Sequence, residues 1–169
     1  VEPNAAHQAL ARLQREYPGA VYLVTQNVDD LHERGGSPQV CHMHGELRSM
    51  LCRHCGETLP AQAPFDASSH CPDCDQPGGL RPDIVWFGEM PYHMAEIGQQ
   101  LSSCDLFVAV GTSGVVYPAA GFVREAHAHG AMTVEVNKEI SEVSGLFQRQ
   151  RQGAATLEVT ALVEELLES

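Results

Sequence analysis

The chain has 169 residues, 43% of them hydrophobic, and a formal net charge of −12 at pH 7. This length and apolar fraction predict one domain with a real core and room for a small insert. The acidic balance argues against direct binding to nucleic acid or to an anionic membrane surface, and no stretch approaches the roughly 18 apolar residues of a membrane helix.

The first predicted element is a helix that Asn4 caps and that the Pro-Gly pair at 18–19 ends. The continuous apolar run 21–24 then predicts a strand buried on both faces. The polar stretch TQNVDD, residues 25–30, follows it and leads into a short helix at 30–34. The apolar residues of the first helix share one face: Ala6, Leu10, Leu13 and Tyr17.

Residues 39–51 predict two short extended stretches that break at Gly45. Residues 52–80 differ in composition, because they hold four cysteines, several prolines and glycines, and little apolar periodicity. We expect a loop-rich insert here. The predicted domain division is a small zinc-binding module at 47–80 within a nucleotide-binding domain made of 1–46 and 81–169.

After the insert, helices and strands alternate. We expect a strand at 83–87, a helix through Met94, Ile97 and Leu101, and a strand in DLFVAV that runs into a glycine turn. A helix from Pro118 to a stop at Gly130, a strand at 132–137 and an amphipathic helix at 159–167 complete the order.

This alternation predicts an α/β fold, a doubly wound, Rossmann-like parallel sheet with helices on both faces. Ligands bind such sheets at the carboxyl ends of the strands. The polar stretches after three strands should therefore lie on one rim: 25–30, 111–114 and 137–139.

The cysteines give the most specific signal. Four of the six form two C-x-x-C pairs that are fifteen residues apart, which is the spacing of a closed, tetrahedral, structural zinc site. The alternative is two disulfides or four free thiols. The uneven distribution is unlike a secreted disulfide scaffold, so we expect a reducing, cytoplasmic compartment. The pairs are Cys52 with Cys55 and Cys71 with Cys74; Cys41 and Cys104 are interpreted as small buried apolar residues.

The rim residues leave two interpretations open. The polar groups after the first strand can bind sugar hydroxyls, or they can cap the turn that follows. The stretch GTSG at 111–114 can cradle a nucleotide, but it lacks the G-x-G-x-x-G spacing and is at least as well explained as a strand-to-helix turn. An acid in NKE, 137–139, can hold a ribose or be solvated.

Two histidines flank Met43. His44, just before Gly45, is a usable general base at neutral pH. A lone histidine is more often structural, and His42 is interpreted as structural support.

Taken together, the chain resembles the sirtuins, the NAD-dependent protein-lysine deacylases. The matching stretches occur in the family's order and cover residues 3–167: TQNVDDLHERGG, HMHGEL, the two C-x-x-C pairs, LRPDIVWFGEMP, GTSGVVYPAAGF and VEVNKE. The residues of these motifs are most similar to those of the class that includes bacterial enzymes and the mitochondrial desuccinylase.

The resemblance implies roles for individual residues. Gln26, Asn27 and Asp29 would line the nicotinamide-ribose pocket, with Asn27 and Asp29 assisting catalysis, and His44 would be the general base on a ribose hydroxyl. The four paired cysteines would bind zinc. The adenosine side of NAD would contact Gly111, Thr112, Ser113, Asn137, Lys138, Glu139 and Ala155.

An acyl-lysine peptide would add as a strand between two segments, with Phe87 and Val116 as walls of the acyl-lysine tunnel. The implied chemistry yields nicotinamide, free lysine and O-acyl-ADP-ribose. The competing hypotheses are a non-catalytic zinc-ribbon module that binds peptides or a partner, and ADP-ribosyl transfer. The two segments are Val85, Trp86, Phe87, Gly88 and Glu89, and Gly114, Val115, Val116 and Tyr117.

The chain begins with Val1 and contains neither a signal-peptide pattern nor the family's G-A-G-x-S segment. We therefore expect it to be the later part of a longer protein, and we expect that the 169 residues alone do not bind NAD productively. A thermal shift on addition of NAD would overturn this expectation.

Overall fold

The computed structural model describes residues 1–66, 68–112, 117–139, 141 and 143–168. The chain divides into two compact units, which are described separately. The first consists of 1–22, 31–39 and 95–169, and the second of 23–30 and 40–94. The division predicted from the sequence, with a module at 47–80, stays a prediction.

The first unit is built on a parallel sheet. Its strands β6 (Leu106–Val110), β7 (Met132–Asn137) and β8 (Arg149–Gln152) lie in the order β6-β7-β8. The first two strands and their parallel pairing confirm the α/β prediction. Strand β8 is not predicted from the sequence, because its residues RQRQ offer no apolar signal. As an outer strand of this sheet it leaves most of these side chains exposed.

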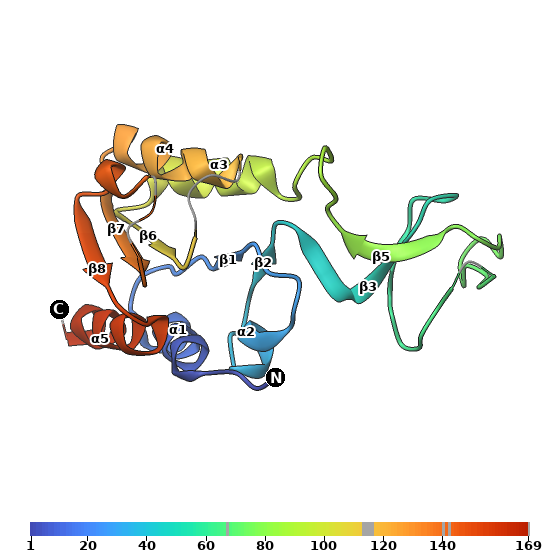
Figure 1. Ribbon diagram of the computed structural model, residues 1–169, viewed down its shortest axis with the longest axis horizontal. Coiled ribbons are helices and arrows are strands. Elements are labelled where there is room, and N and C mark those ends of the chain that lie inside the picture. The colour runs from blue at the N-terminus through green and yellow to red at the C-terminus, as the bar shows by residue number, and fades with distance from the viewer. Residues whose placement is uncertain (67, 113–116, 140, 142, 169) are drawn as a thin grey trace. The chain divides into compact units, whose positions relative to one another are not determined.

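Helices cover both faces of this sheet, as Figure 1 shows. On one side α1 (Ala5–Glu16) packs against α5 (Ala155–Glu168), and on the other lie α3 (Met94–Ser103) and α4 (Phe122–Ala128). The 3-10 turn η1 (Ala119–Gly121) leads into α4, η2 (Ser144–Leu146) precedes β8, and α2 (Leu31–Arg34) is one short turn.

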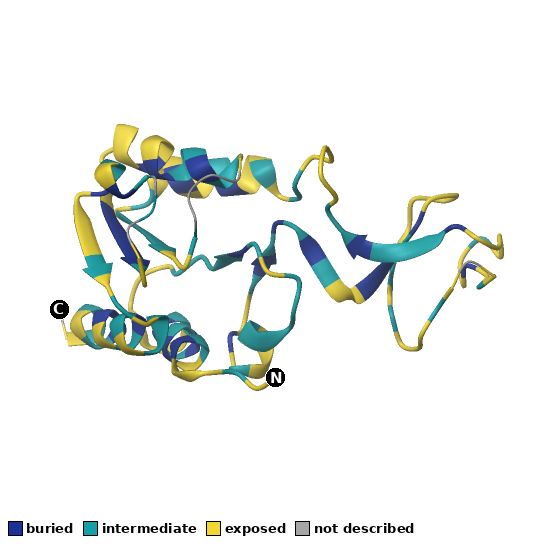
Figure 2. Ribbon diagram, viewed as in Figure 1, coloured by how far each residue is buried: buried dark blue, intermediate teal, exposed yellow. Residues whose placement is uncertain are grey.

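The core of this unit forms where α1 and α5 meet the sheet, and Figure 2 shows the buried residues on these elements. The predicted cap of α1 is confirmed, since the Asn4 side chain accepts hydrogen bonds from the N–H groups of Ala6 and His7. The core residues are Ala6, Ala9, Leu13, Val134, Val136, Val159, Leu162 and Val163.

The second unit holds two small sheets. The strands β1 (Val24–Thr25) and β2 (Cys41–His42) form a parallel pair. The strands β3 (Gly45–Cys52), β4 (Thr58–Pro60) and β5 (Leu80–Ile84) form an antiparallel sheet in the order β4-β3-β5. The strand predicted at 21–24 is wrong for its first three residues. Of this segment only Val24 lies in a strand, and that strand, β1, ends at Thr25.

The strand predicted at 83–87 is shifted. It ends at Ile84 as β5 and pairs antiparallel with β3, not with the parallel sheet. Gly45 permits this pairing. It has a φ of +76°, and a Cβ placed on it would lie 2.0 Å from the Asp83 carbonyl oxygen. Only glycine therefore allows β3 to approach β5 so closely at this point.

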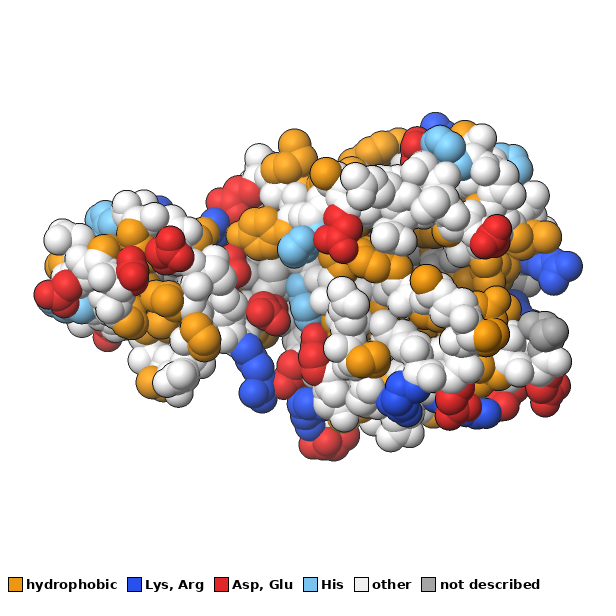
Figure 3. Space-filling view, turned by 180° about the vertical axis from the view of Figure 1, so that it is seen from behind, with side chains coloured by type: hydrophobic (Ala, Val, Ile, Leu, Met, Phe, Trp, Pro, Cys, Tyr) orange, Lys and Arg blue, Asp and Glu red, His pale blue; other side chains and the backbone are white. Residues whose placement is uncertain are grey.

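Within the described residues, no helix is long and apolar enough to cross a membrane. Figure 3 shows one face of the molecule, on which acidic and basic side chains are interspersed with hydrophobic ones.

Candidate active site and thiol cluster

The four paired cysteines converge in the second unit. Their sulfur atoms all lie within 4.8 Å of one another, with 3.8 Å between Cys52 and Cys74 and 3.9 Å between Cys55 and Cys71. Four thiolates bound tetrahedrally to zinc at about 2.3 Å would be about 3.8 Å apart. The geometry and the donor set therefore fit a closed structural zinc site.

Both cysteine pairs lie on the same kind of turn. In the first, the Cys52 N–H donates to the carbonyl of Glu57, and the Cys52 carbonyl accepts from the N–H of Gly56. In the second, Cys71 does the same with Gln76 and Asp75. The residue four after the first cysteine has a positive φ in both turns: +79° at Gly56 and +57° at Asp75.

Burial differs between the members of each pair. Cys52 and Cys71 are buried, whereas Cys55 and Cys74 are more accessible. The backbone N–H of Cys55 lowers the pKa of the Cys52 thiol to about 6. Desolvation and the neighbouring thiols raise the pKa of the Cys55 thiol to about 12. In the absence of a metal, Cys52 is thus the thiol of this pair that loses its proton more easily.

A second group of polar residues surrounds the loop that follows β1. The Nδ1 atom of His44 lies 3.1 Å from the backbone oxygen of Gln26, and Nδ1 of His42 lies 3.4 Å from that of Asn27. A carbonyl can only accept, so the hydrogen of the neutral His44 ring sits on Nδ1. The Nε2 atom then has its lone pair available to take a proton.

Further bonds hold this loop in place. The hydroxyl of buried Thr25 accepts from the N–H of Asn27, and the carbonyl of Val28 accepts from the N–H of Leu47. Arg48 forms an ion pair with Asp30 at 2.7 Å. The predicted residues Gln26, Asn27 and Asp29 thus lie on a loop braced by β2 and β3, with Asn27 exposed.

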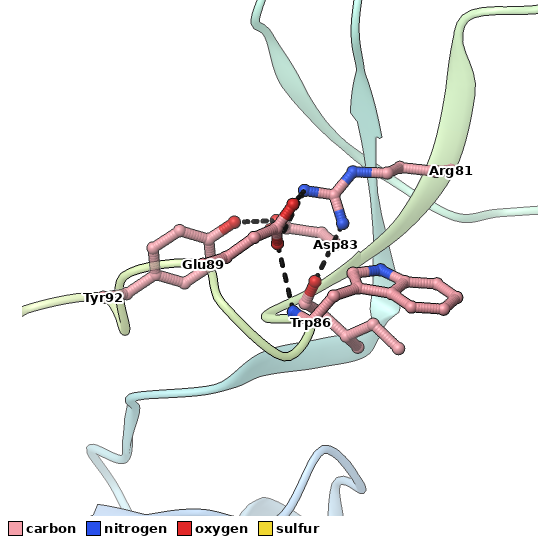
Figure 4. Close-up of polar contacts among 6 residues, drawn as sticks. Arg81, Asp83, Trp86, Glu89 and Tyr92 are labelled. Carbon is pink, nitrogen blue, oxygen red and sulfur yellow. Dashed lines mark hydrogen bonds and ion pairs between the residues drawn. The ribbon is translucent and has the colours of Figure 1, made fainter. Parts of the chain in front are cut away.

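A third group, shown in Figure 4, closes the turn after β5. Arg81 donates to the Ile84 carbonyl at 2.9 Å and to both carboxylate oxygens of Glu89 at 3.0 and 3.1 Å. Glu89 also accepts from the backbone N–H of Trp86 at 3.0 Å. The N–H of Trp86, followed by Arg81, lowers the pKa of Glu89 and keeps it ionised.

A neighbouring bond runs from the Tyr92 hydroxyl to buried Asp83 at 2.8 Å. Burial, followed by this bond, raises the pKa of Tyr92. Sequence reasoning missed Arg81, Asp83 and Tyr92 as functional candidates. The only signal was the spacing of opposite charges eight residues apart, which a strand and a turn bring together.

In the first unit, two of the predicted polar stretches meet. The Asn137 side chain donates to the Thr112 carbonyl at 2.7 Å, and the Gly111 N–H donates to the Val136 carbonyl at 2.9 Å. A small cavity opens beside them, lined by Glu135, Asn137, Glu139, Ser144, Gln150, Arg151 and Gln152. These contacts place Gly111 and Thr112, at the end of β6, beside Asn137, at the end of the adjacent strand β7.

The remaining predicted residues are placed as follows. Lys138 and Glu139 are exposed after β7, and Ala155 begins α5. Val85 is half-buried, whereas Trp86, Phe87, Gly88, Glu89 and Tyr117 are exposed. The predictions for Ser113, Gly114, Val115 and Val116 fall outside the described residues.

Comparison with known proteins gives one consistent result. Residues 1–118 match the Sir2 family. The NAD-dependent protein deacylase of Vibrio cholerae serotype O1 is 50% identical over 167 residues, which are 99% of this chain and 68% of that protein.

Solved structures agree. A Sir2 homolog–NAD complex is 33% identical with a TM-score of 0.88, covering 99% of this chain and 66% of that one. A Sir2 protein bound to a myristoylated histone peptide is 32% identical with a TM-score of 0.81, covering 99% and 73%.

Proposed function

Because this chain belongs to the Sir2 family and is an NAD-dependent protein deacylase, we propose that His44 is its general base. The observation that carries the proposal is the bond between His44 Nδ1 and the Gln26 carbonyl. This bond fixes the tautomer and leaves Nε2 as the proton acceptor.

NAD is the co-substrate of this reaction. We propose that the acyl oxygen of the modified lysine attacks the anomeric carbon as nicotinamide leaves. Nε2 of His44 then takes the proton of a ribose hydroxyl, and that hydroxyl attacks the acyl-imidate carbon. The lysine amine then leaves and water adds to the cyclic intermediate, so that NAD, acyl-lysine and water give nicotinamide, free lysine and O-acyl-ADP-ribose.

We assign the loop residues Gln26, Asn27 and Asp29 to the nicotinamide ribose. Support comes from the bracing of this loop by β2 and β3, which fixes its polar groups before substrate arrives. On the adenosine side the proposal names Gly111, Thr112, Ser113, Asn137, Lys138, Glu139 and Ala155. The hydrogen bond from the Asn137 side chain to the Thr112 carbonyl supports this assignment, because it brings two members of the group together.

The proposed protein substrate is an acyl-lysine peptide, bound along 85–89 and 114–117. The exposure of Trp86 and Phe87 supports this assignment, as does the myristoylated histone peptide bound to the Sir2 relative. Bound zinc would be held by Cys52, Cys55, Cys71 and Cys74 and would supply structural cross-linking of 52–74. We also propose a cytoplasmic location, supported by the six described cysteines, none of which forms a disulfide.

The test is His44→Ala in the active deacylase. We expect kcat to fall by at least about 100-fold, because a general base contributes that much, while zinc stays near one ion per chain. His42→Ala is the matched control, since it removes a similar contact one carbonyl away; it should lower kcat by less than about tenfold.

If His44→Ala keeps normal activity, the assignment of the base is wrong. Mass spectrometry of the products separates the alternatives, because only deacylation yields O-acyl-ADP-ribose. Binding of an acyl-lysine peptide without any turnover would instead favour the non-catalytic module.

A further inference from the structure

The turn that follows β5 is closed by a side-chain bridge that the reaction chemistry does not use. The bridge consists of Arg81 and Glu89, which join both ends of the turn to β5. Arg81 is well anchored, because its backbone is paired with Leu51 in β3 and its side chain is only 19% exposed. A guanidinium in this position can bind two points of the turn at once.

Residues 86–89 form a tight β-turn. The N–H of Glu89 donates to the carbonyl of Trp86, and Gly88 has a φ of +89°, as the third residue of a type II turn requires. Glu89 adds a second bond across the same turn by accepting from the N–H of Trp86. At the other end, the N–H of Val85 donates to the carbonyl of His44.

These bonds leave a defined set of backbone groups for a ligand. The polar groups of Ile84 O, Val85 N–H and Trp86 N–H are already occupied. Among the residues that the structure describes, the backbone groups of Phe87 and Gly88 make no hydrogen bond. They lie at the tip of the turn beside exposed Trp86 and Phe87. A peptide arriving as an extended strand could pair with this tip and contact both rings.

We propose that Arg81 and Glu89 are positioning residues that hold the turn 84–89 in the conformation that receives the acyl-lysine peptide. The inference rests on the proposed peptide site. It adds Arg81 to that site and gives Glu89, which is already part of it, a role that requires no contact with the substrate. Their work is to order the turn in advance, so that peptide binding does not have to supply the ordering free energy. Loss of the bridge should therefore weaken peptide binding and leave the affinity for NAD unchanged.

The first test follows Trp86, the single tryptophan of the chain. We expect Arg81→Ala and Glu89→Ala to lower the steady-state fluorescence anisotropy of Trp86 and to increase its quenching by acrylamide. Glu89→Gln keeps an oxygen that can accept from the Trp86 N–H, so it should remain closer to the wild type. The matched controls are Arg124→Ala and Glu168→Gln, both exposed and outside this turn. Unchanged Trp86 signals in both alanine variants would overturn the proposal, whether or not the protein is active.

The second test is steady-state kinetics, with an acyl-lysine peptide and NAD varied in turn. We expect the peptide KM to rise by roughly tenfold in Arg81→Ala and Glu89→Ala, the loss of about one charged hydrogen bond. The KM for NAD should stay within about twofold. The effect of the double variant should be smaller than the sum of the two single effects, because the ion pair between the two residues is lost in each.

Zinc content and thermal midpoint separate a local effect from unfolding. A variant that loses zinc, or in which kcat and both KM values change together, would contradict a positioning role. A wild-type protein that binds NAD but shows no NAD-dependent deacylation would refute the proposed function. In that case the proposal is decided by Trp86 fluorescence during titration with the acyl-lysine peptide, and equal affinity in wild type and Arg81→Ala would refute it.

Discussion

Replacing Gly45 by alanine tests whether the close contact between β3 and β5 depends on glycine. The added Cβ would lie 2.0 Å from the Asp83 carbonyl oxygen, 2.9 Å from its carbon and 3.0 Å from Ile84 Cα. These neighbours are all backbone, so relief requires the strands to separate. A positive φ costs an alanine about 1–2 kcal/mol, and overpacking adds about 1–3 kcal/mol. We therefore expect the free energy of unfolding to fall by about 2–5 kcal/mol.

Urea denaturation followed by Trp86 fluorescence measures this change, since Trp86 belongs to the same unit as Gly45. The control is Gly98→Ala in α3, where a Cβ would meet nothing within 4 Å. Because Gly98 belongs to the first unit, the unfolding of this variant is followed by far-UV circular dichroism. An alanine within a helix should stabilise by about 0.5–1 kcal/mol. If the free energy of unfolding of Gly45→Ala lies within about 0.5 kcal/mol of the wild-type value, the steric explanation is refuted.

Three other predictions follow from single contacts. Cys71→Ser should lower bound zinc from one ion to well below one per chain, measured by a colorimetric assay on the denatured protein, while Cys104→Ser should retain it because Cys104 lies outside the thiol cluster. Asn4→Ala should destabilise the first unit by about 1 kcal/mol through loss of the α1 cap, measured by thermal circular dichroism; Asn4→Asp should be close to neutral. Because the pKa of Tyr92 is raised in the folded state, its contribution to stability is complete below about pH 10 and lost as pH rises through the folded value. Tyr92→Phe should remove this alkaline loss, and an identical pH profile in that variant would contradict the assignment.

Much of the fold follows from local sequence signals. The cysteine spacing identifies the metal cluster because a C-x-x-C turn is defined by four consecutive residues. Asn4 identifies the start of α1 for the same reason, as capping involves only the next three residues. The apolar strands β6 and β7 and the amphipathic α5 are likewise apparent from their own residues.

What the sequence could not reveal depends on distant partners. The end of β5 is set by bonds from Arg81 and Glu89, which are eight residues apart. The tautomer of His44 depends on the Gln26 carbonyl, eighteen residues away. The polar strand β8 forms because β7 offers it a backbone partner, and no pattern within RQRQ reports that.

The matched turns at Cys52 and Cys71 bear on how quickly a metal ion can enter and leave. Each turn is closed by backbone hydrogen bonds among its own six residues, so each cysteine pair can bind a metal ion through two sulfur atoms independently of the other pair. The buried first cysteines face away from solvent, and the accessible members, Cys55 and Cys74, are where a competing chelator begins its attack. We therefore expect metal exchange to begin with dissociation of the ion from one cysteine pair while the other pair stays bound to it. A thiol-rich acceptor that binds the accessible sulfurs should therefore remove zinc faster than dilution alone.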